Sequence, residues 1–387
     1  MKYAHIVGWG SYLPDRVLKN DEIARTVATT DEWIYTRTGI RERRIAATQE
    51  TTATLAFEAA ARALEVADLH PSQVDLIIVA TSTPEYIFPS TACRVQDYLG
   101  ARRAGAFDLS AACSGFVYGL AVGSQALATE SARTALVIGA ETLSRVVDWQ
   151  DRGTCILFGD GAGAVVLKAS SVPGGVMAST LRSDGSGGEL LSLPAVYHNP
   201  VPALGPEYLY KNGHQKNTIH MAGREVFRFA ISVLADVIEE VLERAGLTIN
   251  DLALIVPHQA NVRIIDTAAK RLKVSPDLFY MNLETAGNTS AASIPIALCD
   301  AVAEGRLRPD DNVLFVGFGG GLTWAASVVK WDVTPPPVPL VEREWKRARY
   351  IAARSRSKLR KLGRRAGAAL LGSPTPGARL RDANRKR

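Results

Sequence analysis

A single cysteine, Cys113, has the surroundings that a catalytic nucleophile needs. It lies in residues 107–116 (FDLSAACSGF), where a strand is predicted to end near Leu109 and a helix rich in small residues to begin near Ser114. A thiol at a helix N-terminus faces free N–H groups and the positive end of the helix dipole, which favours the thiolate. The alternative is a buried cysteine that acts only as a small apolar side chain, the commoner role of a lone cysteine.

Two further polar side chains follow predicted strands or open predicted helices. His258 follows an apolar strand at 254–257, and Asn288 stands in residues 287–293 (GNTSAAS). Polar groups at strand ends are often functional in α/β sheets. The alternatives are a loop histidine bonded to backbone and an asparagine that only caps a helix. A glycine run at 317–321 (GFGGG) would let the backbone approach a ligand closely.

The other cysteines, Cys93, Cys155 and Cys299, are widely spaced and form no CxxC pair. This spacing argues against a zinc site and against a disulfide framework, and we expect these three thiols to be buried. Residues 159–163 (GDGAG) lack the lysine of a phosphate-binding loop and the spacing of a dinucleotide motif. We therefore interpret them as a tight turn, and we predict no metal site.

Apolar segments of strand length alternate with segments of helical periodicity through residue 332. Continuous β-branched runs at 76–80 and 135–139 predict buried strands, and residues 51–67 and 223–245 predict helices. This alternation indicates an α/β fold. Each half has a long helix, a strand and a functional loop in the same order, so we predict two halves, 1–170 and 171–332.

The remaining residues, 333–387, differ from the rest of the chain in composition. They begin near a proline run at 335–337 and carry 16 Lys and Arg against 3 Asp and Glu, whereas residues 1–332 have a net charge of −7. The apolar runs are far shorter than the roughly 20 residues that a membrane-spanning helix needs. The N-terminus shows no signal-peptide pattern, so we expect a cytoplasmic protein.

The order of these motifs resembles that of β-ketoacyl-acyl-carrier-protein synthase III, over about residues 1–332. The matching stretches are 31–43 (DEWIYTRTGIRER), 111–116 (AACSGF), 151–154 (DRGT), 158–163 (FGDGAG), 257–261 (PHQAN), 287–291 (GNTSA) and 318–321 (FGGG). Elongating ketoacyl synthases have a second histidine where this chain has Asn288. Plant-type polyketide synthases usually have a proline within the glycine run, which is missing here.

The resemblance implies a thiolase-like duplicated fold with two mixed five-stranded sheets layered with helices (αβαβα). It implies that Cys113 takes an acyl group from acyl-CoA and that malonyl-acyl-carrier protein then loses CO₂ and attacks it. His258 and Asn288 would stabilise the decarboxylation, and the N–H groups of Cys113 and Gly320 would form an oxyanion hole. The product is 3-oxoacyl-acyl-carrier protein, the reaction initiates fatty-acid synthesis, and no cofactor is required.

The resemblance also implies binding residues for both substrates. Those that match the CoA site are Trp33, Arg37, Arg152 and Asn261. Arg224 replaces an asparagine that contacts pantetheine in some relatives, which puts that contact in doubt. Phe88 matches a residue that reaches across a homodimer interface to the partner's acyl pocket. Arg228 and Arg263 match basic positions that receive the acidic carrier protein, and no nucleic acid is expected.

Two other functions remain open at this point. A related condensing enzyme or acyltransferase that primes a specialised polyketide-type pathway would share these motifs. A non-catalytic subunit of the same fold would usually have lost the nucleophile, whereas this chain keeps Cys113. The sequence leaves open the primer acyl group and whether the malonyl donor is carrier protein or CoA.

The tail is predicted to contact membranes peripherally. Residues 341–371 place apolar side chains, including Trp345, at helical spacing among many arginines and lysines. Such a basic amphipathic helix binds anionic lipid, with roughly 1 kcal/mol per basic residue near the surface. The alternatives are a disordered solvated tail, attraction of the acidic carrier protein, and nucleic-acid binding, which is disfavoured because no recognition module is present.

We expect the full chain, but not a 1–332 truncation, to sediment with anionic vesicles at low salt, because the tail holds the excess positive charge. Sedimentation at low and high salt measures this. Equal sedimentation of the two forms at low salt would contradict the membrane role.

Overall fold

The computed structural model describes residues 2–194 and 217–332, together with six exposed helical residues of the tail (Ala352, Ser355, Arg356, Leu359, Leu362 and Gly363). The strands are β1 (Tyr3–Tyr12), β2 (Arg16–Lys19), β3 (Glu42–Ile45), β4 (Leu76–Ala80), β5 (Gly105–Leu109), β6 (Thr134–Thr142), β7 (Asp160–Ser170), β8 (Gly175–Ser183), β9 (Leu191–Ser192), β10 (His220–Met221), β11 (Leu254–Pro257), β12 (Asp311–Gly319) and β13 (Thr323–Trp331). Most of the predicted tail helix lies outside the described residues.

The helices are α1 (Asn20–Ile23), α2 (Asp31–Thr38), α3 (Thr52–Val66), α4 (Thr91–Leu99), α5 (Gly115–Ala128), α6 (Gly223–Ala245), α7 (Val262–Leu272), α8 (Leu283–Ala286) and α9 (Ser293–Ala303). Three short 3-10 turns matter for the site: η2 (Ala112–Ser114), η7 (Pro276–Leu278) and η8 (Ser290–Ala292). Both long helices that the periodicity predicted are present.

The two main sheets have the same strand order. In the first, the order is β1-β7-β6-β4-β5, and in the second β8-β13-β12-β11. In both, the first two pairings are antiparallel and the third is parallel. The repeated order, with helices in corresponding places, is the duplication that sequence identity between the halves is too weak to reveal.

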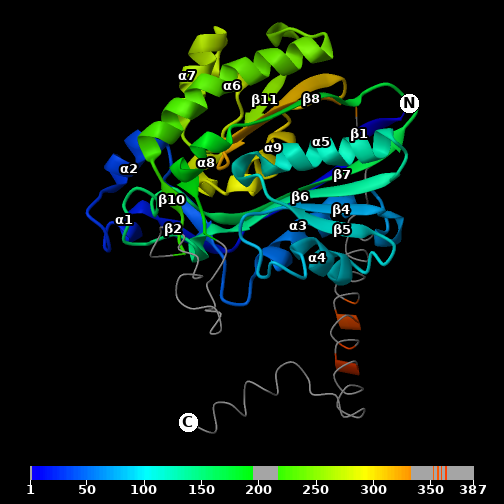
Figure 1. Ribbon diagram of the computed structural model, residues 1–387, viewed down its shortest axis with the longest axis horizontal. Helices are drawn as coiled ribbons and strands as arrows, with labels where there is room; N and C mark the ends of the chain where they lie inside the picture. Colours follow the sequence, from blue (N-terminus) through cyan, green and yellow to red (C-terminus); the bar gives the residue numbers. More distant parts are fainter. Residues whose placement is uncertain are drawn as a thin grey trace, which may run out of the picture.

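Five layers stack in the order helix, sheet, helix, sheet, helix (Figure 1). Helices α5 and α9 lie between the two sheets, and α5 contacts strands of both. Helices α3 and α4 cover the outer face of the first sheet, and α6 and α7 cover the second. This arrangement confirms the predicted α/β architecture.

The second sheet has four strands in the part of the chain that the structure describes, not the predicted five. The fifth position is occupied by a single parallel bridge between Ile255 and Phe279, where the Tyr280 N–H donates to the Ile255 carbonyl at 2.8 Å. The chain there lies between η7 and α8, which leaves too few extended residues to form a longer strand.

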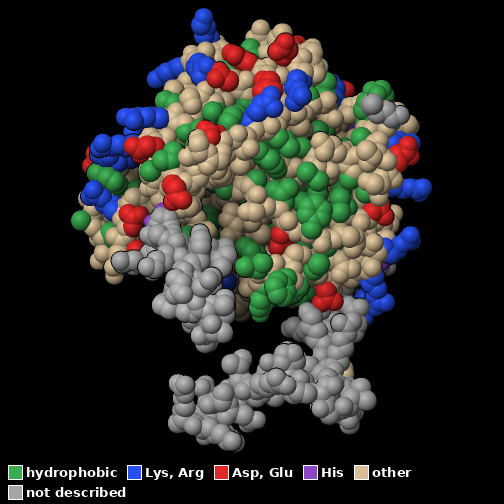
Figure 2. All heavy atoms as spheres, viewed as in Figure 1, with side chains coloured by type: hydrophobic (Ala, Val, Ile, Leu, Met, Phe, Trp, Pro, Cys, Tyr) green, Lys and Arg blue, Asp and Glu red, His purple; other side chains and the backbone are tan. Residues whose placement is uncertain are grey.

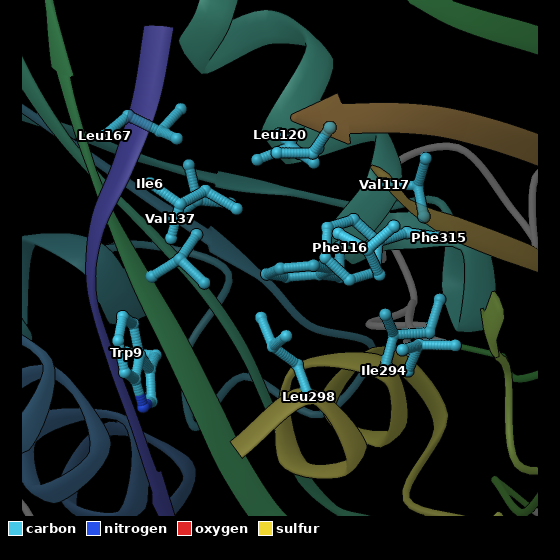
Figure 3. Packing of buried hydrophobic residues seen from close by; sticks show 14 of the residues in the cluster. Ile6, Trp9, Phe116, Val117, Leu120, Val137, Leu167, Ile294, Leu298 and Phe315 are labelled. Atoms are coloured by element: carbon cyan, nitrogen blue, oxygen red, sulfur yellow. The ribbon is translucent and has the colours of Figure 1, made fainter. Parts of the chain in front are cut away.

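The layer between the sheets is the main core (Figure 3). Phe116 of α5 meets Phe315 of β12 edge to face, with ring centroids 6.1 Å apart, and Leu120 and Leu298 fill the space beside them. All four are fully buried. Burial of each such side chain stabilises the fold by about 1.5–3 kcal/mol, so this layer fixes how the two halves face each other.

Glycines allow the backbones of the two halves to touch. A Cβ on Gly139 of β6 would lie 2.0 Å from the Ala291 carbonyl oxygen of η8, and one on Gly319 of β12 would lie 2.7 Å from the Cys113 nitrogen. Residues 159–163, predicted to form a tight turn, instead lead into strand β7. Gly163 is needed there because a Cβ would lie 2.7 Å from the backbone of α9.

We expect Gly139→Ala to lower the free energy of unfolding by about 1–3 kcal/mol or more, because the new methyl group must displace the η8 backbone. Gly105→Ala in β5 is the matched control, since its nearest neighbours would be 3.9 Å from the new Cβ. Urea denaturation of both variants measures the difference. Equal stability of the two variants would show that this backbone contact is not tight.

Candidate active site

Cys113 lies in η2, between the end of β5 and the start of α5. Only 6% of the residue is exposed, and burial raises the pKa of its thiol to about 12. We expected the helix start to favour the thiolate, but burial acts in the opposite direction and is the largest effect on this group. The resting site therefore holds a neutral thiol near pH 7.

The glycines at the end of β12 and in the turn after it lie directly against the nucleophile. A Cβ on Gly317 would be 3.1 Å from the Cys113 carbonyl oxygen, and a Cβ on Gly320 would be 3.6 Å from the Ala112 side chain. Together with the Gly319 contact, this places the turn next to the Cys113 N–H. The structure thus brings both predicted oxyanion donors, Cys113 and Gly320, to one place, and their role stays a prediction.

His258 follows β11 and is buried, with 2% exposed. Its backbone N–H donates to the Val316 carbonyl at 2.7 Å. Its ring packs edge to face on the ring of Phe318, with the ring centroids 5.3 Å apart. Burial lowers the pKa of the imidazole to about 3, so the ring is neutral across the physiological range. Its ring is bonded to the hydroxyl of Ser293, so the interpretation as a loop histidine bonded only to backbone does not describe it.

Sequence reasoning missed Ser293, whose hydroxyl lies 2.7 Å from His258 Nδ1 and 2.8 Å from the Ser290 carbonyl oxygen. A hydroxyl has one hydrogen to donate. When it goes to the Ser290 carbonyl, Nδ1 carries the ring proton and donates to the Ser293 oxygen; when it turns to Nδ1 instead, the neutral imidazole carries its proton on Nε2 and can donate from there. In the sequence, the only signal for this role of Ser293 was its spacing from Asn288 in GNTSAAS.

Asn288 is buried in the loop between α8 and η8. Its Oδ1 accepts from the Ser290 N–H at 2.9 Å, which leaves the Nδ2 donor on the opposite edge of the amide. Its backbone is fixed on both sides, since its N–H donates to the Leu157 carbonyl and its carbonyl accepts from Gly159 N–H, each at 2.9 Å. Thr289 is the residue directly before η8, but the bond from the Ser290 N–H means that the Asn288 side chain does cap the start of this turn.

Arg43, which the sequence analysis named only within a motif, packs against the loop that holds Asn288. It is fully buried and donates to the Ile156 carbonyl at 2.6 Å and to Asn20 Oδ1 at 2.8 Å. Its Cβ would lie within 3.0 Å of any Cβ placed on Gly159 or Gly287. Burial lowers the pKa of its guanidinium to about 10, so the group remains charged at neutral pH.

These contacts link the elements that lie around Cys113. Turn η2 packs on η8, η8 follows Asn288, and Ser293 joins η8 to His258. Phe318, which touches His258, precedes the glycines that touch Cys113. The structure therefore brings the three predicted catalytic residues to a single buried site from separate elements.

The predicted CoA residues also lie together. The guanidinium carbons of Arg37 and Arg152 lie 4.3 and 4.7 Å from the centroid of the Trp33 ring. Asn261 caps α7 by accepting from the Arg263 N–H, and its Nδ2 donates to the Arg37 carbonyl at 2.9 Å. Arginine and tryptophan planes of this kind stack on a purine base, but binding itself stays a prediction.

The predicted interaction residues are exposed. Phe88 is 85% exposed, beside the exposed Tyr86 and Ile87 in the loop between β4 and α4. Arg228 on α6 and Arg263 on α7 are exposed too, and lysines and arginines gather over α6, α7 and α2 (Figure 2).

The other cysteines differ from what we expected. Cys155 is buried and Cys299 partly buried, but Cys93 is exposed because it lies on the outward face of α4.

In the described ranges, no His, Cys, Asp and Glu side chains gather to hold a metal ion. No helix of the described part is long and apolar enough to cross a membrane.

Comparison with known proteins agrees with this geometry. Family models described as 3-oxoacyl-[acyl-carrier-protein] synthase III and as its C-terminal part match residues 107–185 and 242–331. A β-ketoacyl-[acyl-carrier-protein] synthase III from Caldanaerobacter subterraneus subsp. tengcongensis is 53% identical over 329 residues, which are 85% of this chain and 98% of that protein.

Solved structures give the same result. The 3-oxoacyl-[acyl-carrier-protein] synthase III of Aquifex aeolicus is 46% identical, with a TM-score of 0.78 over 84% of this chain and 99% of that one. The priming β-ketosynthase of a polyketide biosynthetic pathway is 38% identical, with a TM-score of 0.79 over 87% and 98% of the two chains. The chain therefore belongs to the β-ketoacyl-acyl-carrier-protein synthase III family of condensing enzymes.

Proposed function

We propose that the chain condenses an acyl-CoA primer with malonyl-acyl-carrier protein, releases CO₂ and forms a 3-oxoacyl-acyl-carrier protein that initiates fatty-acid synthesis. The observation that carries this proposal is the buried thiol of Cys113, enclosed by the glycine turn and by the elements that hold His258 and Asn288. A nucleophile beside two neutral hydrogen-bond donors suits acyl transfer followed by decarboxylation.

In the first step, the sulfur of Cys113 attacks the thioester carbonyl and CoA leaves. The carbonyl oxygen becomes negatively charged in the transition state, and the N–H groups of Cys113 and Gly320 would stabilise it. Trp33, Arg37, Arg152 and Asn261, at the surface near α2 and α7, would hold the CoA nucleotide and its arm.

In the second step, malonyl thioester loses CO₂ and its carbanion attacks the acyl group on Cys113. Decarboxylation places negative charge on the malonyl thioester oxygen. Neutral His258 donating from Nε2 and Asn288 donating from Nδ2 would stabilise that charge. In a buried site, loss of one such donor costs roughly 3–4 kcal/mol.

Priming of a specialised polyketide-type pathway is the second candidate, supported by the 38% identity to a polyketide priming synthase. It would use the same residues with a different primer. A mass-spectrometric panel of acyl-CoAs would identify the primer that Cys113 retains. A non-catalytic role is disfavoured, because Cys113, His258 and Asn288 are all present and grouped.

A homodimer is part of the same proposal. Strand β5 is an edge of the first sheet, and Phe107 on it is 40% exposed near the exposed Tyr86, Ile87 and Phe88. A sheet edge with an apolar surface favours pairing with a second copy, in which Phe88 would line the partner's acyl pocket. Sedimentation of the full chain at several concentrations tests this association.

Exposed Arg228 and Arg263 are proposed to receive the acidic carrier protein. The guanidinium carbon of Arg263 lies 5.5 Å from the centroid of the Phe227 ring.

The reaction as written needs no cofactor, because the thiol and neutral hydrogen-bond donors perform it. A cytoplasmic location, where acyl-CoA is available, and peripheral membrane contact through the tail remain predictions.

We expect His258→Ala and Asn288→Ala each to slow decarboxylation by about 100-fold or more while Cys113 still accepts an acyl group. The reason is that both side chains are assigned to the malonyl thioester oxygen. Acid-quenched single-turnover assays with labelled acyl-CoA, and separate CO₂ release assays, measure the two steps. Because the pKa of His258 is lowered to about 3, wild-type decarboxylation should show no break near pH 6.5.

His70→Ala is the matched control, since His70 is exposed and bonds only to its own turn. It should leave both steps unchanged. A His258 or Asn288 variant that fails to accept the acyl group yet releases CO₂ normally would mean that the two roles are assigned to the wrong step.

A further inference from the structure

The hydroxyl of Ser114, the residue after the nucleophile, is not used in the way that its position suggests. Ser114 directly precedes helix α5, where a serine commonly caps the helix with its side-chain oxygen. In the described part of the chain, its side chain makes no such capping bond. Ser114 is fully buried, and its hydroxyl donates instead to Thr323 Oγ1 at 2.8 Å, from the first half of the chain to the second.

Thr323 begins strand β13, directly after the turn at residues 320–322, and pairs with Gly319 across the hairpin of β12 and β13. Its hydroxyl lies 3.0 Å from the Gly320 carbonyl oxygen and 3.1 Å from the Ala111 carbonyl oxygen. Each hydroxyl has one hydrogen to donate. When Ser114 donates to Thr323 and Thr323 donates to Gly320, the two hydroxyls form a continuous chain of hydrogen bonds from η2 to the turn.

The same hydroxyls hold the backbone that presents the nucleophile. Ala112, the residue before Cys113, has a φ of 45°, in the left-handed region that disfavours residues with a Cβ. The peptide that enters Ala112 carries the Ala111 carbonyl. This carbonyl oxygen accepts from the Ser114 N–H at 3.2 Å and lies 2.8 Å from the Ser114 hydroxyl and 3.1 Å from that of Thr323. These contacts keep the peptide in the orientation that this φ requires.

The other end of the turn is held by different bonds. The Leu322 N–H donates to the Asp184 carbonyl at 2.8 Å, and the Asp184 N–H donates to the Leu322 carbonyl at 2.9 Å. The Gly320 end is bonded to Thr323. Because a glycine backbone has little conformational preference of its own, the position of Gly320 depends on such contacts.

The two predicted oxyanion donors come from the two elements that these hydroxyls join. The Cys113 N–H belongs to η2, and the Gly320 N–H belongs to the turn after β12. Donors stabilise a developing oxyanion when they lie about 2.7–3.1 Å from its oxygen, and a misplacement of about 1 Å can cost about 100-fold in rate. The separation of η2 and the turn therefore matters for the chemistry as well as for packing.

We propose that Ser114 and Thr323 are positioning residues that set the separation of the two oxyanion donors, Cys113 and Gly320. The proposal rests on the proposed function, because these donors act on the thioester carbonyl of the acyl substrate. The hydroxyls work through the backbone and do not themselves contact the reacting atoms. If they served only to satisfy buried carbonyls, their loss would lower stability without slowing acylation.

The test is single-turnover acylation of the full chain with acetyl-, butyryl- and hexanoyl-CoA, followed by intact mass. Thr323→Val keeps the shape of the side chain but removes its hydroxyl, and Ser114→Ala removes the other hydroxyl. Each should lower the saturating acylation rate about 10- to 100-fold. The acyl-CoA concentration that gives half of this rate should not change, because neither hydroxyl belongs to the proposed CoA site. Thr323→Ser, which keeps the hydroxyl, should restore most of the rate.

Two further measurements separate positioning of the oxyanion donors from other effects. Alkylation of Cys113 by iodoacetamide forms no oxyanion, so its rate in Thr323→Val should equal that of wild type. The double variant Ser114→Ala/Thr323→Val should be no slower than the slower single variant, because the two hydroxyls act through one shared hydrogen bond.

Ser327→Ala is the matched control. Ser327 lies on the same strand, β13, and is fully buried, and its hydroxyl lies 2.8 Å from that of Ser179 on β8. The variant therefore also loses a hydrogen bond between two buried or partly buried hydroxyls, but one that does not involve η2 or the turn. It should lower the melting temperature and leave the acylation rate unchanged.

Acylation by Thr323→Val and Ser114→Ala as fast as that by Ser327→Ala would overturn the proposal. Iodoacetamide alkylation slowed by the same factor as acylation would also overturn it, because the hydroxyls would then act on the sulfur. Additive losses in the double variant would do the same. Failure of wild type to be acylated on Cys113 by any acyl-CoA would overturn the proposed function, which is a separate result. If Ser114→Ala does not fold, Thr323→Val and Thr323→Ser decide.

Discussion

The contact between the backbones of the two halves is the constraint on which the site depends. Gly139 of β6 lies against the Ala291 carbonyl, and Gly319 of β12 lies against the Cys113 nitrogen. In each pair, one residue comes from the first half of the chain and the other from the second. A side chain at Gly139 would push η8 away from β6, and one at Gly319 would push η2 away from β12, so the turns that carry the nucleophile and follow Asn288 would be displaced. The apolar layer of α5 and α9 supplies the stabilisation that keeps these backbones together.

Burial sets the protonation state of every group in the site. It raises the pKa of Cys113 and lowers that of His258, and in both cases it is the largest cause. Both shifts favour the neutral form, as expected when charge is moved away from water. A neutral, dry site strengthens the hydrogen bonds that form only when charge develops during the reaction. The same burial creates the need to move a thiol proton.

Much of the fold could be predicted because local signals agreed with the tertiary structure. Helix α6 spans the residues that its apolar periodicity indicated, and Gly246 ends it with the left-handed φ of 68° expected of a C-terminal glycine. The motif around Cys113 indicated the corner between a strand and a helix, which the structure confirms. The prediction of a fifth strand in the second sheet was wrong, because strand pairing at Phe279 depends on the lengths of the flanking turns.

The parts of the site that could not be predicted depend on burial and on contacts between distant residues. Ser293 is an ordinary helix-start residue in the sequence, and its hydrogen bond to His258 joins residues 35 positions apart. The pKa of Cys113 followed its burial, which no local pattern encodes, and not its position at a helix start. Cys93 was wrongly expected to be buried because its exposure depends on which face of α4 packs on the sheet.

Cys113 is proposed to carry the acyl group between the two steps. Intact and peptide mass spectrometry, first after incubation with acyl-CoA and then after addition of malonyl-acyl-carrier protein, measures this directly. We predict one acyl mass on the peptide that contains Cys113, its loss when the malonyl substrate is added, and neither event in Cys113→Ala. An acyl group retained by Cys113→Ala, or one on Cys113 that malonyl-acyl-carrier protein does not remove, would contradict this role of Cys113.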